Sequence, residues 1–155
     1  MMTIPPRCPD CGALQAAGET CETYFHQLLF WEAERPDYGA QVHHLMVLCY
    51  HLQHPGLYSP QGLIAARRLL ADFLDRGLSP QAVRQRIRAR VDSGARTWTI
   101  TARTDAHGAY EPPVAWTMTV ADVVAGGVEA YCDHVRAWAQ SIRAALATRD
   151  RQASA

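Results

Sequence analysis

Hydrophobic residues along this chain recur with the spacing of an α-helix. From about residue 20 they follow at every third or fourth position, which places them on one helical face. The stripe consists of Tyr24, Phe25, Leu28, Leu29 and Trp31. Glu32, Glu34 and Arg35 fall beside this stripe and are expected to face solvent. The segment 36–39, with its proline and its glycine, is expected to break the helix.

The next stretch, residues 40–54, is apolar on most of its sides. A helix of that kind lies at the centre of a fold, because it has apolar neighbours on most of its faces. Pro55 and Gly56 are expected to end it. The pattern therefore predicts a second helix that is buried by the others.

Capping signals indicate the starts of three further helices. Ser59 and Ser79 each stand before a proline, so each can cap a helix whose first residue is that proline. We expect these helices to end near residues 75 and 93. Thr119 and Asp122 have the spacing of a capping box, which predicts a short helix that stops at Gly126.

The periodicity changes near residue 96. Residues 97–101 alternate between polar and apolar side chains, which is typical of a strand, and residues 114–118 offer a partner strand. A last helix is predicted over residues 128–149, because apolar residues again follow the helical spacing there. A disordered tail is expected over residues 151–155.

The length suits one domain with its own hydrophobic core, since the chain has 155 residues. We expect a mainly α fold, a single-domain helical bundle of about five to six helices over residues 1–150. Residues 1–21 are expected to form a zinc-knuckle loop, called here the knuckle loop. One short β-hairpin is allowed by the alternation described above.

Charge and composition limit the classes of partner that this chain is expected to bind. The formal net charge is zero, so the chain has no general attraction to nucleic acid or to an anionic membrane. Four arginines between residues 84 and 90 are interpreted as a solvated helical face. Without an apolar run of about 18 residues, no membrane span is expected, and no signal peptide is recognised. A cytoplasmic location is expected, where the five cysteines stay reduced.

The candidate chemistry lies in the knuckle loop. Cys8 and Cys11 are separated by two residues and followed by Gly12, a pattern in which a tight turn presents both sulfurs to one metal ion. Cys21 adds a third thiol. Thiolates at this spacing are typical of zinc sites, so we expect Zn²⁺ as the cofactor.

The fourth ligand is sought among the histidines of the second helix. His43, His44, His51 and His54 fall within one face about 100° wide. If the first two helices form an antiparallel hairpin, Cys21 lies opposite His51 and the knuckle loop lies near His54. The preferred metal site is Cys8, Cys11, Cys21 and His54, with His51 as a substitute and His26 as a third candidate for the fourth position.

The other end of that helix face is too far from the thiols to share their metal. His43 lies about 16 Å from His54 along the helix axis, whereas zinc–nitrogen bonds are about 2 Å long. We therefore expect His43, with Tyr50, to line a pocket for an unidentified small molecule or protein partner. Cys49 and Cys132 lie in apolar helical segments and are interpreted as core thiols.

These motifs resemble those of an uncharacterised bacterial family that is classed as a domain of unknown function. The similarity rests on the Cys-x2-Cys-Gly knuckle, on the helix that follows Cys21 and on Tyr50-x2-Gln53-His54-Pro55. The resemblance implies a shared site but no reaction. It also implies more weight for His43, Tyr50, Gln53 and His54 than for the other histidines of that helix.

Three functions remain open. The first is a small zinc-binding protein with a structural Cys3His-type site and a His/Tyr-lined pocket. The second is a zinc-dependent, hydrolase-like enzyme with an open metal position and Glu22 or His51 as general base. The third is a nucleic-acid-binding or regulatory module, which the zero net charge disfavours. The sequence contains no nucleophile elbow, phosphate-binding loop or dinucleotide fingerprint.

Overall fold

The structure is a computed structural model that describes residues 4–77, 79, 81–82, 85 and 108–154. The described part is helical and holds no β-strand, only an isolated bridge between Arg7 and Leu14. The prediction of a mainly α fold is therefore confirmed. The α-helices are α1 (Cys21–Glu34), α2 (Pro36–Gln53), α3 (Pro60–Arg76), α5 (Val120–Ala125) and α6 (Tyr131–Ala153), and two short 3-10 helices are η1 (Ala16–Gly18) and η2 (Pro55–Leu57).

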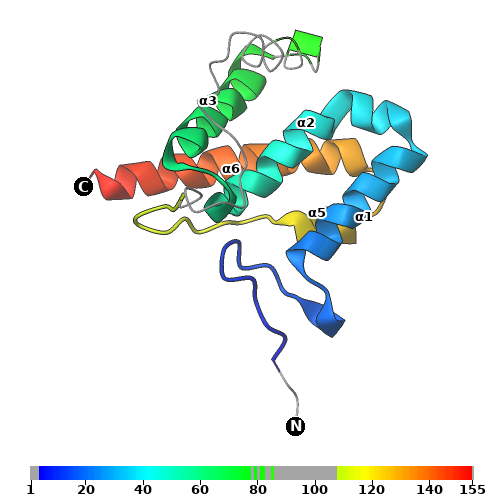
Figure 1. Cartoon of the computed structure of the whole chain (residues 1–155), viewed down its shortest axis with the longest axis horizontal. Helices are drawn as coiled ribbons and strands as arrows, with labels where there is room; N and C mark the ends of the chain where they lie inside the picture. Colours follow the sequence, from blue (N-terminus) through cyan, green and yellow to red (C-terminus); the bar gives the residue numbers. More distant parts are fainter. Residues whose placement is uncertain (1–3, 78, 80, 83–84, 86–107, 155) are drawn as a thin grey trace.

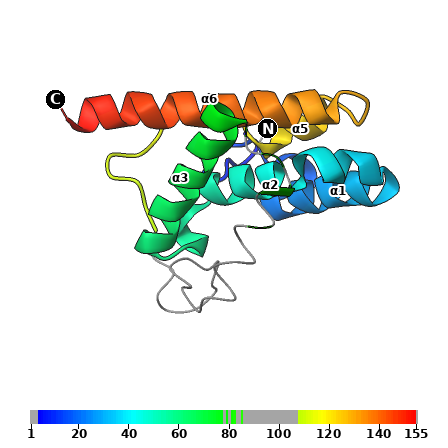
Figure 2. The same ribbon diagram turned by 90° about the horizontal axis from the view of Figure 1, so that it is seen from above.

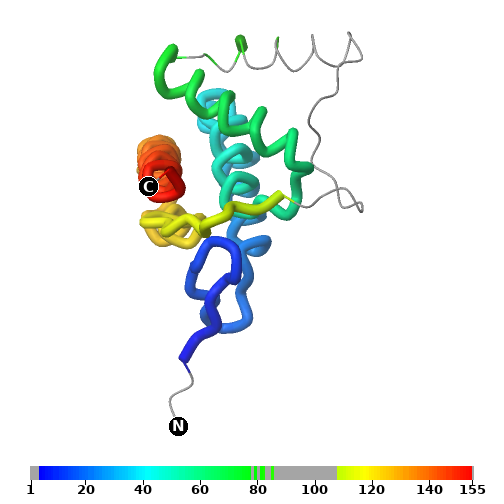
Figure 3. Tube along the Cα trace, turned by 90° about the vertical axis from the view of Figure 1, so that its left-hand side faces the viewer, coloured from blue at the N-terminus to red at the C-terminus, as the bar shows by residue number. Residues whose placement is uncertain are grey.

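Helix α2 is the centre of the fold, as its apolar character predicts. It packs against α1, α3 and α6. Most residues of its second half, from Leu45 to Gln53, are buried. Helices α1 and α2 form a hairpin, and α6 runs across the molecule beside them (Figures 1 and 2). Figure 3 shows the knuckle loop at one end of the molecule, below α5 and the segment that leads into it.

Two predicted helix boundaries are wrong. The break expected at residues 36–39 does not occur, because Pro36 takes the first position of α2 and only Arg35 separates the two helices. A proline is well placed there, since the first residue of a helix has no hydrogen bond to donate within it. The tail expected over residues 151–155 is helical as far as Ala153.

The capping signals are confirmed where the structure describes them. Thr20 caps α1 through a capping box with Thr23, and the Ser59 hydroxyl accepts from the backbone N–H of Gly62. Thr119 and Asp122 form the predicted capping box of α5. Local hydrogen bonds of this kind are encoded within a few residues, which is why the sequence locates these helix starts so closely.

The predicted β-hairpin lacks one strand. Residues 114–118 are described and form no strand. The other predicted strand, residues 97–101, and most of the helix predicted from Ser79 to residue 93 lie outside the described residues. Among the helices that are described, none is long and apolar enough to cross a membrane.

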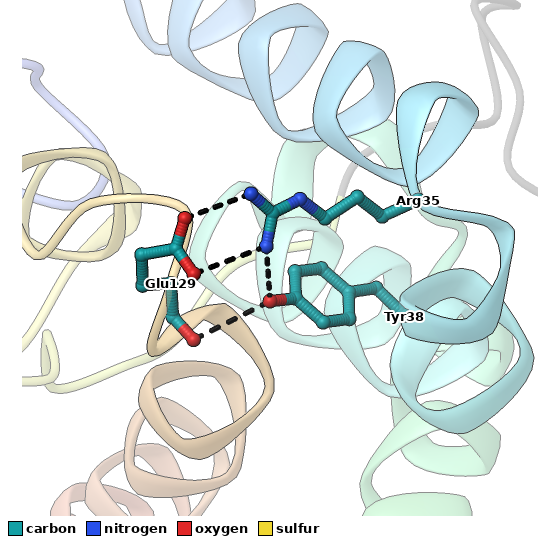
Figure 4. A network of polar contacts seen from close by, with 3 residues as sticks. All are labelled: Arg35, Tyr38 and Glu129. Carbon is teal, nitrogen blue, oxygen red and sulfur yellow. Dashed lines mark hydrogen bonds and ion pairs between the residues drawn. The ribbon is translucent and has the colours of Figure 1, made fainter.

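The turn between α1 and α2 is bound to the segment that leads into α6 (Figure 4). The Arg35 guanidinium donates to both carboxylate oxygens of Glu129, at 2.8 and 3.2 Å, and to the Tyr38 hydroxyl at 2.8 Å. The Tyr38 hydroxyl in turn donates to the Glu129 backbone carbonyl at 3.4 Å. This bidentate contact fixes the closed end of the hairpin against α6.

At the opposite end of α2, Gln53 joins three segments inside the core. Its side chain is fully buried. Its amide nitrogen donates to the Met118 carbonyl at 2.7 Å, and its amide oxygen accepts from the indole N–H of Trp138 at 3.1 Å. One of these two hydrogen bonds connects α2 to α6, and the other connects α2 to the segment before α5. Together they position the end of α2.

Replacing Gln53 by alanine should lower the free energy of unfolding by about 3 kcal/mol, because the fully buried Trp138 N–H is left without a partner and the Met118 carbonyl loses its hydrogen bond. Urea unfolding measures the change. Gln140, an exposed residue of α6, is the matched control, and its alanine variant should stay within about 0.5 kcal/mol of the wild type. Equal effects of the two substitutions would contradict this account of the core.

Candidate metal centre

The knuckle loop forms a tight turn that points two sulfurs inward. The Gly12 N–H donates to the Cys8 carbonyl at 2.9 Å, and the Cys8 N–H donates to the Ala13 carbonyl at 2.9 Å. Gly12 has a φ of +80°, a left-handed conformation that residues with a Cβ rarely adopt. Cys8 and Cys11 are both buried despite lying in a loop near the N-terminus.

Four predicted ligands meet at one point. Cys21 begins α1, and its sulfur lies 3.5 Å from that of Cys11. The Cys8 sulfur lies 3.7 Å from Nε2 of His54, the residue that ends α2. The four ligand atoms all lie within 4.8 Å of one another, and all four residues are buried. Around a tetrahedral zinc ion, neighbouring sulfurs stand about 3.8 Å apart, so the cluster has the size of a metal site.

The backbone of α2 sets the orientation of the His54 ring. Nδ1 of His54 donates to the Tyr50 carbonyl at 2.6 Å. A proton on Nδ1 leaves the lone pair on Nε2, the nitrogen that faces the Cys8 sulfur. Metal-binding histidines are commonly held in this way by a hydrogen bond from the other ring nitrogen.

Aromatic rings cover the cluster. The Tyr50 ring stacks on His54 with centroids 4.3 Å apart, and Phe25 stacks on the other side of Tyr50 at 4.4 Å. Tyr50 is buried. The stack shields the ligand atoms from water, which strengthens the electrostatic interactions among them.

Cys11 and Cys21 do not both ionise without a cation. The hydrogen bond between Cys11 and Cys21 raises the pKa of Cys11 and lowers the pKa of Cys21, so the two sulfurs share one proton. Burial further raises the pKa of Cys11. A divalent cation would replace that proton and neutralise the thiolates, which is the usual chemistry of a buried cysteine cluster.

The other candidates for the fourth position lie outside the cluster. His51 is buried between Phe25 and Tyr58, and burial lowers its pKa to about 4. His26 is exposed and lies 4.0 Å from Glu22 on the surface of α1. Neither belongs to the group of ligand atoms that meet.

Cys49 and Cys132 lie among apolar side chains, as their helical positions predict. Cys49 is fully buried in α2, and burial raises its pKa well above the ordinary value of a thiol. Cys132 is half-buried and packs against the core. Both thiols lie outside the group that meets at the knuckle loop.

The structure separates His43 from Tyr50. Tyr50 belongs to the aromatic stack over the thiols, whereas His43 lines a pocket of about 500 Å³ near the closed end of the hairpin. Tyr50 is not among the residues that line this pocket. The residues of this pocket are Leu29, Glu32, Ala33, Pro36, Gly39, Ala40, His43 and His44.

Glu32 is the residue that sequence reasoning missed. It was expected to face solvent, but only 7% of it is exposed. One carboxylate oxygen accepts from Nδ1 of His43 at 2.8 Å, and the other accepts from the Tyr131 hydroxyl at 2.7 Å. In the hairpin, the end of α1 lies opposite the start of α2. This register is the sequence signal that could have paired Glu32 with His43.

The Glu32–His43 contact makes the stability of the fold depend on pH. The hydrogen bond to Glu32 raises the pKa of His43 above its ordinary value of 6.5. The charged pair therefore stabilises the folded state fully below that value, and the contribution is lost as the pH rises through the raised pKa of the folded state. The size is modest, because 43% of the His43 side chain is exposed.

Replacing His43 by glutamine should therefore destabilise the protein more at about pH 5.5 than at about pH 8.5. Thermal unfolding at the two pH values measures the difference. His26→Gln, which removes an exposed histidine beside a glutamate, is the control and should show little change at either pH. A larger effect of His43→Gln at the higher pH would contradict the assigned pairing.

Comparison with known proteins places the chain in a family. No curated protein and no solved structure matches it. A family of unknown function, DUF5946, matches residues 6–147. The matched span includes Cys8, Cys11, Cys21 and His54 as well as the Glu32–His43 pair. It covers most of the chain, and the protein therefore belongs to this family of unknown function.

Proposed function

We propose that this chain is a small zinc-binding protein in which a Cys3His site is structural and the helical hairpin presents a pocket for a small molecule. The observation that carries the proposal is the convergence of four buried ligand atoms, all within 4.8 Å of one another. Three separate segments supply them: the loop with Cys8 and Cys11, the start of α1 and the end of α2.

The donor set favours zinc. Three sulfurs and one imidazole nitrogen match the tetrahedral N/S coordination of structural zinc sites. Softness of the thiolate ligands disfavours magnesium and calcium, which prefer oxygen. The Nδ1 hydrogen bond of His54 to a backbone carbonyl supplies the orientation that such a ligand needs.

A structural role follows from the number of ligands. Catalytic zinc sites have three protein ligands and keep a position for water, whereas structural sites have four. With Cys8, Cys11, Cys21 and His54 bound, no position is left for a substrate. The enzymatic alternative has Glu22 or His51 as general base, but Glu22 is exposed beside His26, and neither residue belongs to the group of ligand atoms. The closed site therefore supports the structural alternative better than the hydrolase.

The ion would join segments that are distant in sequence. Cys8 and His54 are 46 positions apart, and the knuckle loop contributes few other buried side chains. Since a preformed site is absent in the unfolded chain, metal binding adds to the free energy of folding. We propose that zinc holds the knuckle loop against the open end of the hairpin and so completes the core there.

Purified, reduced protein should contain about one zinc per chain, because the four donors satisfy one tetrahedral ion. Cys8→Ser and His54→Gln should each lose most of the metal and lower the melting temperature. Inductively coupled plasma mass spectrometry measures the metal, and differential scanning calorimetry measures the stability. Protein without any bound transition metal would contradict the proposal.

The matched controls are the thiols and the imidazole that lie outside the cluster. Cys49→Ala and Cys132→Ala should keep a full complement of zinc, because both side chains act as apolar core groups. His51→Gln should keep it as well, although His51 lies only three residues before His54. Loss of zinc in any of these variants would show that the ligand set is wrong.

A further inference from the structure

We propose that Glu32, His43 and Tyr131 form a proton-transfer site, in which Nε2 of His43 acts as a general base on a water molecule that hydrolyses a small acyl ester held in the neighbouring pocket. The proposal rests on the pocket of the proposed function and does not involve the metal. Its evidence is a hydrogen-bonded chain of three side chains from three helices that ends at a pocket wall.

Burial of Glu32 is the first observation. The carboxylate lies between α1, α2 and α6, and its two oxygens accept hydrogen bonds from different helices, at 2.8 Å from His43 and at 2.7 Å from Tyr131. A carboxylate is rarely buried to this degree unless it is paired. Both oxygens of Glu32 are used in these contacts, and one of its two partners, His43, lines the pocket.

The direction of the histidine ring is the second observation. Because Nδ1 of His43 donates to Glu32, the neutral ring carries its lone pair on Nε2, on the other side of the ring. The ring is partly exposed, with 43% of the side chain accessible. A partly exposed imidazole that a carboxylate orients through Nδ1 is the arrangement that general-base catalysis uses.

The volume and the lining of the pocket limit the kind of ligand that it can bind. Its volume is about 500 Å³, and its walls combine the apolar residues Leu29, Ala33 and Pro36 with Glu32, His43 and His44. Gly39 lies on the wall, and a Cβ there would meet the Glu32 carboxylate oxygen at 3.4 Å. A small molecule with an apolar part and a carbonyl group near His43 fits this combination.

The proton step balances within the site. Nε2 takes a proton from water while the water oxygen bonds to the acyl carbon, and the imidazolium charge is compensated by Glu32. The bond from the acyl carbon to the leaving oxygen then breaks, its electron pair stays on that oxygen, and the oxygen takes the proton from Nε2, which gives the free acid and an alcohol. Tyr131 keeps its proton, since burial and Glu32 both raise its pKa.

The surroundings of His43 agree with this role. Glu32 of α1 is the charge that raises the pKa of His43, and Tyr131 of α6 acts through Glu32. His44 is the titratable ring beside it on α2, with centroids 5.5 Å apart. A raised pKa makes His43 a stronger base, and the base is fully available only above that pKa.

The test uses p-nitrophenyl acetate as the ester probe and zinc-loaded, full-length protein in a Cys132→Ser background, which removes a partly exposed thiol that the probe could acylate. The steady-state release of p-nitrophenolate is followed after any initial burst. His43→Gln should reduce the enzymatic rate by roughly 100-fold, the lower end of the usual contribution of a general base. His26→Gln, the exposed control, should leave the rate unchanged. Equal rates for the parent protein and His43→Gln, including no rate above buffer in either, would overturn the proposal.

A further variant tests Glu32 as a positioning residue. Glu32→Gln should shift the inflection of the pH–rate profile downward, because it removes the carboxylate that raises the pKa of His43. Long-range ¹⁵N–¹H spectra of the parent protein should show the neutral ring of His43 protonated at Nδ1. A neutral ring protonated at Nε2 would overturn the proposal even if Glu32→Gln fails to fold.

Zinc content separates this inference from the structural role of the metal. His43→Gln should keep about one zinc per chain, because His43 lies about 16 Å from His54 along α2. If zinc is retained and the ester rate does not depend on His43, the proton-transfer site is wrong while the metal centre stands. If zinc is absent from the parent protein, the metal centre is wrong. The dependence of the ester rate on His43 then still tests the proton-transfer site.

Discussion

The meeting of three sulfurs and one imidazole at a single buried point is the constraint on which the N-terminal part of the structure depends. Without a cation, Cys11 and Cys21 must share a proton. A bound cation would attract all four ligand atoms and so hold them together. The helical core of α2 and α6 is held by apolar burial and by Gln53, whereas the knuckle loop has little apolar surface of its own to bury. A bound ion would therefore hold the knuckle loop in place, as side-chain packing holds the helices.

The hairpin of α1 and α2 gives the protein two chemically different ends. At the open end, Cys21 starts α1 and His54 ends α2, so both face the knuckle loop. At the closed end, Glu32 and His43 pair beside the pocket, and the Arg35–Glu129 contact fixes that end against α6. About 16 Å of helix separates His43 from His54. A metal bound at the open end would thus leave the pocket at the closed end unoccupied by it.

The sequence predicts the Cys3His cluster better than the pocket, for a physical reason. Cys8, Cys11 and the capped start of α1 are encoded within a few residues, and one assumption, the hairpin register, adds His54. Burial of Glu32 depends on its hydrogen bond with Tyr131, which lies 99 positions later. No local sequence pattern predicts a partner at that distance. Similar reasoning explains the start of α2, where Pro36 looks like a break but occupies the one helical position that suits it.

X-ray absorption at the zinc edge tests the central claim, a closed four-ligand site, most directly. The account predicts three sulfurs at about 2.3 Å and one imidazole nitrogen at about 2.0 Å, with no oxygen in the first coordination sphere. A spectrum with an oxygen ligand, or with fewer than three sulfurs, would contradict the account, because it would mean an open site or a different set of ligands.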